Sequence, residues 1–389
     1  MSEKTLKALR VVGINVLVFA GLVLLLELVG QYIAATRPTY DVLFLEPDRA
    51  VGWKQVPNLR WRWAGFFWYA SDFSVEIETN PLGFHDVARE LPKPPGVTRV
   101  AMLGDSFIEA VQVSLSKTAA QVLEQWLNAS QAGSPGEGQR WEVLNFGISA
   151  YGVGQYLLAW EKYASEYHPD YVAILVAGLQ MRRTSAKYEY GAFNATRNQK
   201  LWIRPTFRLE NGSLIREPAR DYDKFVQAQQ NLIATEFGGQ RSRRKRPGLV
   251  TLHYFRALRG YLGSLEARLG FPLEENAEDE PLSDAEIIAI NLKIIEEVGN
   301  QVERAGSKLV VLDMSRFLGD REVVPQILKA SCDNHGFGYV PVYDDLLRAQ
   351  VSGVRLRWPH DLHLNEAGNA VLADAVYRWF TKTSASGQR

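Results

Sequence analysis

A serine, an aspartate and a histidine in this chain occupy two short polar segments that border apolar stretches. Ser106 ends a Gly-Asp-Ser tripeptide that directly follows the apolar run 100–103, and Asp361 and His363 precede an apolar stretch near the other end. A serine hydroxyl becomes a good nucleophile only when a base takes its proton, and an imidazole oriented by a carboxylate is such a base. We therefore predict Ser106 as nucleophile, His363 as base and Asp361 as the group that orients the imidazole.

The residues around Ser106 favour this role. The run 100–103 is typical of a buried strand in a parallel sheet, and Gly104 permits a tight turn after it. Ligands of open α/β sheets bind at the carboxyl ends of the strands, where helix N-termini also favour negative charge. A Gly-Asp-Ser tripeptide alone is a weak signal, because a solvated helix cap has the same residues.

Two further segments, in a fixed order, make the pattern specific. Asn145 and Gly147 form an Asn-x-Gly segment after a second apolar run, and Asp361 and His363 form a late Asp-x-His before the last helix. This ordered set resembles the SGNH (GDSL-type) hydrolases. The resemblance implies a Ser106–His363–Asp361 triad and an oxyanion hole built from the N–H groups of Ser106 and Gly147 and an asparagine side chain. It implies no cofactor and no metal.

Two positions depart from the family pattern. The third block of the family carries Gly-Asn-Asp, whereas residues 178–183 read Gly-Leu-Gln-Met-Arg-Arg, so Leu179 stands where the asparagine belongs. A lost oxyanion donor costs roughly 2–4 kcal/mol of transition-state stabilisation. Gln180 is the nearest amide, and we predict that it replaces the asparagine. Family members more often show Asp-x-x-His, whereas here His360 stands three residues before His363.

Apolar and polar stretches alternate regularly from residue 97 onward, as expected of strands that alternate with helices. This alternation predicts a three-layer α/β/α, flavodoxin-like fold with a mainly parallel five-stranded sheet, in agreement with the resemblance. Strands are predicted at 99–103, 142–146, 171–177, 308–314 and 339–343, and helices at 118–128, 155–166, 283–305, 321–335 and 366–381.

The N-terminal region predicts a membrane anchor. Residues 11–35 are almost wholly apolar, and at about 1.5 Å per residue a helix of this length crosses a bilayer core. Basic residues within 1–10 and acidic residues after the span place the N-terminus in the cytoplasm and the remaining chain outside. Glu27 lies near the outer interface or contacts a membrane-protein partner. A cleaved signal peptide, processed near residues 34–35, is the alternative.

The remaining chain divides by composition. We predict an aromatic-rich β leader at 36–96, an SGNH hydrolase-like domain at 97–382 with an insertion at about 184–282, and a tail at 383–389. The Asn-x-x-Gly-Phe-x-Asp element at 80–86 resembles one in membrane-anchored SGNH proteins linked to bacterial surface polysaccharides. Packing explains the leader aromatics most simply, and a carbohydrate platform or an interfacial belt are the alternatives.

The overall composition limits the classes of partner. Lys+Arg and Asp+Glu number 44 each, so the bulk charge does not indicate nucleic acid. Cys332 is the single cysteine, which excludes an intramolecular disulfide and a cysteine-based zinc site. The basic run 241–246 fits a solvated loop, or a patch that meets anionic lipid or glycan.

These observations lead to one function and one alternative. We expect a bacterial inner-membrane, single-pass protein with a periplasmic or extracellular serine esterase or O-acyl(acetyl)transferase domain that acts on a surface glycan. The glycan is either O-acylated or accepts an acyl group, and hydrolysis and transfer share the acyl-enzyme step. A non-catalytic SGNH-like protein that binds glycan, or that is a scaffold in polysaccharide export, is the alternative.

Overall fold

The structure is a computed structural model in which the chain forms two compact units, one of residues 1–41 and 242–281 and one of residues 42–241 and 282–389. The second unit holds every residue of the predicted triad. The residues described are 3–36, 40–67, 70–131, 140–185, 188–190, 201–219, 222–244, 282–321 and 323–386.

The first unit contains helix α1 (Glu3–Thr36) and most of two short strands, β1 (Tyr40–Val42) and β13 (Ser242–Arg244). Within α1, the stretch from Thr5 to Tyr32 has a mean hydropathy of 2.5 and is long and apolar enough to cross a membrane. Inside this stretch the Glu27 carboxylate accepts a hydrogen bond from Gln31 at 2.7 Å, one turn further along the helix.

The centre of the second unit is a five-stranded sheet in the order β15-β14-β8-β6-β7, and every neighbouring pair is parallel. In chain order this is 2-1-3-4-5 read from the β7 edge, the flavodoxin-like arrangement. The predicted fold class is therefore confirmed. The strands are β6 (Val97–Gly104), β7 (Arg140–Gly147), β8 (Tyr171–Val176), β14 (Lys308–Asp313) and β15 (Gly338–Val340).

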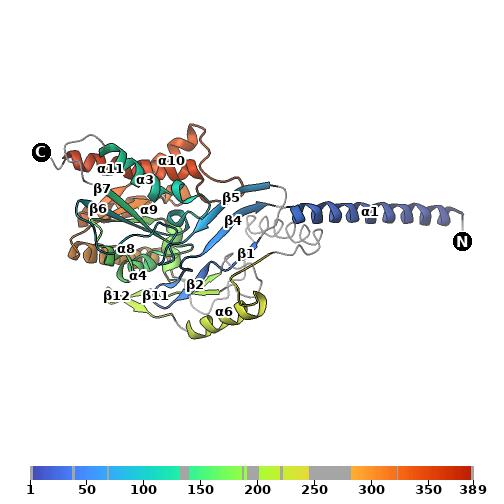
Figure 1. The fold of residues 1–389 in the computed structure, drawn as a ribbon, viewed down its shortest axis with the longest axis horizontal. Helices are drawn as coiled ribbons and strands as arrows, with labels where there is room; N and C mark the ends of the chain where they lie inside the picture. The colour runs from blue at the N-terminus through green and yellow to red at the C-terminus, as the bar shows by residue number, and fades with distance from the viewer. Residues whose placement is uncertain are drawn as a thin grey trace. The chain divides into compact units, whose positions relative to one another are not determined.

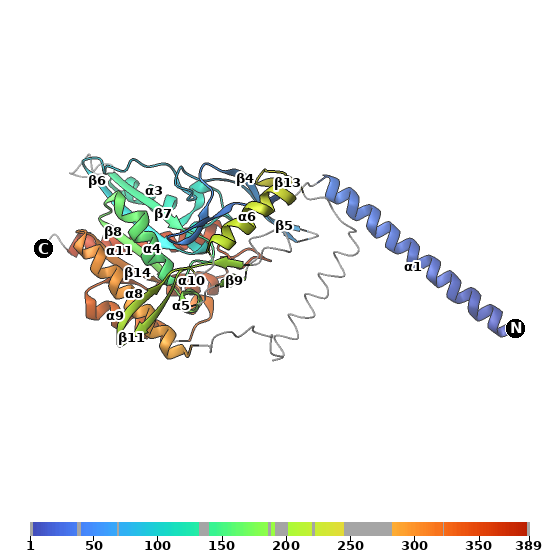
Figure 2. The same ribbon diagram turned by 90° about the horizontal axis from the view of Figure 1, so that it is seen from below.

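Helices cover both faces of this sheet, because alternate residues of its strands point to opposite sides. Val100 and Met102 belong to one apolar core, whereas Ala101 and Leu103 belong to the other. Figure 1 shows one helical layer on each side of the sheet, and the layer that holds α4 and α8 faces the viewer in Figure 2. The first core includes α3 (Ala119–Gln131), α10 (Val342–Val351) and α11 (Glu366–Ser386), and the second includes α4 (Val153–Lys162), α8 (Asp284–Arg304) and α9 (Val323–His335).

Most element boundaries differ by a few residues from those predicted, and at two places the difference has a local cause or changes the type of element. The strand expected at 339–343 ends at Val340, and α10 begins at Val342. Pro341 separates them, because proline has no N–H for the ladder and is tolerated at a helix start. The helix expected at 155–166 begins at Val153 and ends at Lys162, followed by a short 3-10 turn.

The leader forms two antiparallel hairpins that extend the core on the α4 side. Trp53 is fully buried and Trp61 is 6% exposed, so packing accounts for these two aromatic side chains. The side chains of residues 66–71 lie outside the described part of the chain, so the platform and belt interpretations of that cluster are untested. The strands are β2 (Leu45–Asp48), β3 (Gly52–Gln55), β4 (Arg60–Phe67) and β5 (Ala70–Glu78).

The segment 80–86 docks the leader on the sheet. The Asn80 side chain accepts hydrogen bonds from two backbone N–H groups further along the turn, both at 3.0 Å. The Phe84 ring lies 5.0 Å from that of Phe146, in β7. The Asp86 carboxylate accepts the backbone N–H of Asn145 at 3.0 Å. The segment therefore joins the leader to the strand that precedes the predicted oxyanion loop.

The predicted insertion is only partly described, since residues 245–281 lie outside the described ranges. Its β11–β12 hairpin contacts α8, and the buried Phe207 packs on α4, where a Cβ added to Gly154 would lie 2.6 Å from the ring. At the start of the basic run, Arg241 forms an ion pair with Glu46 at 3.1 Å. The elements are α5 (Gly178–Ser185), β9 (Tyr188–Tyr190), β10 (Leu201–Ile203), β11 (Thr206–Glu210), β12 (Ser213–Glu217) and α6 (Tyr222–Glu236).

Candidate active site

Ser106 lies at the first residue of a short helix, α2 (Ser106–Glu109), immediately after β6. The Asp105 side chain caps this helix by accepting the N–H of Phe107 at 3.1 Å. The chain passes from β6 to its neighbour β7 on one side and then crosses from β7 to β8 on the other side of β6. Ser106 therefore stands at the topological switch point where such sheets bind ligands. Ser106 is 8% exposed, as expected of a group at the base of a site.

The structure brings the three predicted triad residues together. Nε2 of His363 lies 2.8 Å from Oγ of Ser106, and Nδ1 of His363 lies 2.5 Å from Oδ1 of Asp361. An ionised carboxylate only accepts hydrogen bonds, so Nδ1 carries the proton and Nε2 is left to accept the serine hydroxyl. This is the arrangement in which an imidazole acts as a base toward serine.

The electrostatics of Asp361 suit this role. Burial would raise its pKa, but hydrogen bonds from the imidazole and the backbone N–H of His363 outweigh burial and hold the pKa below the ordinary value. Asp361 therefore stays ionised at neutral pH and stabilises the imidazolium that forms during reaction. The Phe107 ring, 5.4 Å from the imidazole, borders the same side chain.

The predicted oxyanion donor Gly147 is engaged elsewhere. Its N–H donates to the side-chain Oδ1 of Asn145 at 2.9 Å. A Cβ at Gly147 would lie 2.3 Å from the backbone N of Glu109, so the glycine instead permits close contact between β7 and α2. The backbone N–H of Ser106, in the first turn of α2, stays a predicted donor.

The predicted donor Gln180 also has another partner. Its Nε2 donates to Oδ2 of Asp105 at 2.8 Å, and Arg183 donates to the same oxygen at 3.2 Å. Gln180 is fully buried, whereas Leu179 is 48% exposed. The side chain that replaces asparagine thus lies partly in solvent, and the following amide holds the carboxylate beside the nucleophile. The described contacts give Gln180 a place next to Ser106 but no bond to it.

Sequence reasoning missed the buried carboxylate of Glu109, three residues after the nucleophile. It accepts hydrogen bonds from Gln55 at 2.6 Å and from the hydroxyl of Ser149. Burial raises the pKa of Glu109 to about 7, and these hydrogen bonds and the charge of His363 oppose that shift. No sequence signal marked it, because a glutamate in the first turn of a helix is ordinarily a solvated residue.

Two alanines beside the site hold a backbone conformation that L-residues rarely adopt. Ala110, just after α2, has φ of 53°, and Ala150, in the loop after β7, has φ of 63°. The left-handed region costs a non-glycine residue roughly 1–2 kcal/mol, and such strain gathers at functional sites. Arg204, itself 1% exposed, donates to the carbonyl of Ala150 at 3.3 Å.

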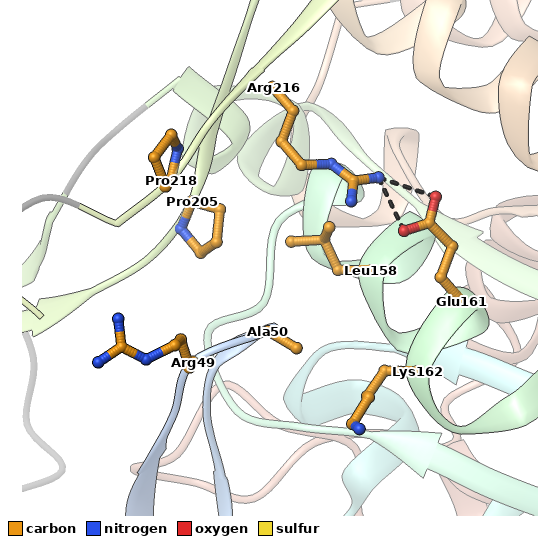
Figure 3. A pocket seen from close by; sticks show the side chains of 8 residues that line it. All are labelled: Arg49, Ala50, Leu158, Glu161, Lys162, Pro205, Arg216 and Pro218. Atoms are coloured by element: carbon orange, nitrogen blue, oxygen red, sulfur yellow. Dashed lines mark hydrogen bonds and ion pairs between the residues drawn. The ribbon is translucent and has the colours of Figure 1, made fainter.

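A cavity of about 350 Å³ lies apart from these residues. Among its cations, Arg216 forms an ion pair with Glu161 at 2.8 Å, drawn in Figure 3, and Arg49 forms one with Asp223. None of the triad residues lines it, so we assign it no part in the chemistry of Ser106. It is lined by Arg49, Ala50, Leu158, Glu161, Lys162, Pro205, Arg216 and Pro218.

Comparison with protein-family models and with curated proteins finds no match. Solved structures similar to this chain include LAE5, an alpha/beta hydrolase enzyme from the metagenome of Lake Arreo, with 13% identity over 72% of this chain and 94% of that one and a TM-score of 0.40. Axe2, an acetylxylan esterase from Geobacillus stearothermophilus, shows 12% identity, coverage of 72% and 93%, and a TM-score of 0.38. A putative lipolytic protein of the G-D-S-L family from Desulfitobacterium hafniense DCB-2 shows 11% identity, coverage of 72% and 99%, and a TM-score of 0.37. The similar structures thus include an acetylxylan esterase and a G-D-S-L family protein.

Proposed function

We propose that this protein is an SGNH-type serine enzyme that cleaves or transfers an O-acyl group, such as acetyl, on a bacterial surface glycan. The observation that carries the proposal is the hydrogen-bonded series from Ser106 through His363 to Asp361, at 2.8 and 2.5 Å. A base that takes the hydroxyl proton, itself oriented by a carboxylate, gives a serine the reactivity that ester chemistry requires.

The reaction proceeds in two balanced steps. In the first, Oγ of Ser106 attacks the ester carbonyl carbon while Nε2 of His363 takes the hydroxyl proton. The tetrahedral oxyanion forms beside the start of α2, then the bond to the leaving oxygen breaks and His363 protonates that oxygen. In the second, water or a sugar hydroxyl gives its proton to His363 and attacks the acyl carbon. The bond from that carbon to Oγ then breaks, and His363 returns the proton to Oγ of Ser106.

The N-terminal helix and the resemblance support the location and the target that we propose. A span through α1 with its basic residues inside the cell would hold the enzyme at the inner membrane with its site outside. Surface glycans are the acylated polymers within reach of such a site. A contact between Glu27 and a membrane-protein partner remains a prediction, and either water or a glycan hydroxyl would complete the reaction.

Covalent labelling tests the step that hydrolysis and transfer share. The full chain in detergent should react with a fluorophosphonate probe, and Ser106→Ala should abolish the labelling with little change in Tm. His363→Ala should lose almost as much, because the two residues act as a unit. Ser213→Ala, which removes an exposed serine in β12, should label like the unchanged protein. Labelling that persists in Ser106→Ala would refute the proposal.

Two observations favour a non-catalytic alternative, a glycan-binding or scaffold role in polysaccharide export. The N–H of Gly147 and the amide of Gln180 both donate to groups other than a developing oxyanion. Leu179 offers no side-chain donor at the family's asparagine position. If the unchanged protein fails to label and nonetheless retains glycan on an affinity column, this alternative replaces the enzyme.

A further inference from the structure

A second carboxylate–imidazole contact lies three residues before the catalytic histidine. The Asp72 carboxylate, in the leader strand β5, accepts the backbone N–H of His360 at 2.6 Å, and its other oxygen lies 2.9 Å from Nδ1 of the same residue. The Asp72 side chain is only 5% exposed, and that of His360 is 29% exposed. A nearly buried carboxylate is stable only when its oxygens are hydrogen-bonded, and His360 supplies two such bonds.

The hairpin touches the same loop at a second point. The Phe73 ring, buried in the leader, lies 5.4 Å from the ring of Trp358. The two contacts fall on consecutive residues of β5 and hold both ends of the segment 358–360. That segment runs directly into Asp361.

The catalytic loop has little regular structure of its own. Residues 358–363, all of which the structure describes, form neither helix nor strand. At the base of the loop Arg357 and Leu364 form an isolated bridge, and the N–H of Trp358 reaches the carbonyl of His363 at 3.4 Å. These bonds close the base of the loop, and the contact with Asp72 holds the loop farther from that base.

The leader also holds the helix that carries the nucleophile. The His85 ring contacts the backbone carbonyl of Glu109 at 2.9 Å, and Gln55 donates to the Glu109 carboxylate at 2.6 Å. Both are fully buried. One segment of the chain therefore touches the two separate elements, α2 and the catalytic loop, whose spacing sets the distance from Ser106 to the imidazole.

We propose that Asp72 is a positioning residue of the active site, which acts through His360 to hold the catalytic loop where His363 meets Ser106. This inference rests on the proposed function, because the reaction it affects is acylation of Ser106. It makes the leader hairpin part of the catalytic apparatus. A misplacement of about 1 Å in such a site lowers the rate by roughly a hundredfold.

The test compares leader variants of the full chain in detergent. Asp72→Ala should lower the fluorophosphonate labelling rate and kcat for p-nitrophenyl acetate by about ten- to a hundredfold, with KM within about twofold and little change in Tm. Asp72→Asn keeps one acceptor and should lose less. His360→Ala keeps the backbone N–H that Asp72 accepts and should lose less than Asp72→Ala. The double variant should lose no more than Asp72→Ala, because both residues act through one contact. Glu76→Gln, which removes an exposed ion pair with Arg60 on the same hairpin, should leave the rates unchanged.

Several results would overturn the proposal. One is a labelling rate of Asp72→Ala within twofold of that of the unchanged protein. Another is a loss of labelling rate in the double variant of Asp72 and His360 that equals the product of the two single losses. If Asp72→Ala fails to fold, a labelling rate of Asp72→Asn within twofold of that of the unchanged protein overturns the proposal instead.

If the unchanged protein itself reacts with neither reagent, the proposed function fails and the positioning is read by NMR instead. The Cε1–H resonance of His363, assigned by its absence from His363→Ala, should shift in Asp72→Ala and stay in place in Glu76→Gln. An unshifted resonance in Asp72→Ala would refute the positioning role.

Discussion

The substitution Glu109→Gln should remove a pH-dependent loss of stability that the buried carboxylate imposes. Burial raises the pKa of Glu109 from its ordinary 4.5 to about 7, so the folded protein resists ionisation of this group more than the unfolded chain does. The difference corresponds to about 3 kcal/mol in the free energy of unfolding, at about 1.4 kcal/mol per pH unit.

The sign follows from proton linkage. Below pH 4.5 the carboxyl is protonated in both states and costs nothing. As the pH rises toward 7, only the unfolded chain releases the proton, and the folded state loses about 3 kcal/mol relative to it. Above pH 7 the loss is constant. In Glu109→Gln this decline should be absent, and the buried Oε1 of Gln55, which has no partner among the described residues, can accept from the new amide.

Guanidinium denaturation of the detergent-solubilised protein at several pH values between 4.5 and 8 measures the effect. Burial also raises the pKa of Asp86 to about 7, so this carboxyl lowers the stability of both proteins over the same pH range. The difference between the stability curves of Glu109→Gln and the unchanged protein therefore isolates the effect of Glu109. The difference should move by about 3 kcal/mol in favour of the variant as the pH rises. Glu76→Gln, at an exposed position, is the control and should show no such trend. If the two proteins differ in free energy of unfolding by the same amount at pH 5 and pH 8, the Glu109 carboxylate is not buried as the structure shows.

Two further predictions concern the loop beside the nucleophile. Gly147→Ala would place a Cβ 2.3 Å from the backbone N of Glu109, so we expect a loss of about 1–3 kcal/mol and slower labelling of Ser106, measured by denaturation and probe kinetics. A stable, fully reactive variant would contradict this close contact. Ala150→Gly should stabilise the fold by up to about 1 kcal/mol because it relieves the left-handed φ of 63°, and an unchanged or lower Tm would argue against strain at that position.

The sequence alone predicted which three side chains meet at the candidate site, because residue type and position next to an element end suggest each role. Ser106 follows an apolar run and a glycine, and His363 follows Asp361 by two residues. Ser106 and His363 are 257 positions apart, yet the structure joins them at 2.8 Å. Parallel strands bring their carboxyl ends to one edge of the sheet, and this rule together with the resemblance to the SGNH hydrolases predicted that these residues meet.

The sequence predicted element boundaries less well wherever an apolar run is compatible with both a strand and a helix. Val342 and Tyr343 continue the run of β15 in the sequence but form the first turn of α10. Short apolar runs do not distinguish a strand from a buried helix by period alone. In the folded protein Val342 packs into the apolar core that includes α3 and α11, as part of the helix α10.

Only the tertiary structure decided the partners of the polar side chains. Gln180 has the chemistry of an oxyanion donor, but its amide meets Asp105, and Asp72 reaches His360 across 288 positions of the chain. The order and period of residues show which element and which face a side chain occupies. A hydrogen bond depends on distances of a few tenths of an ångström and on direction, which the packing of the whole chain sets.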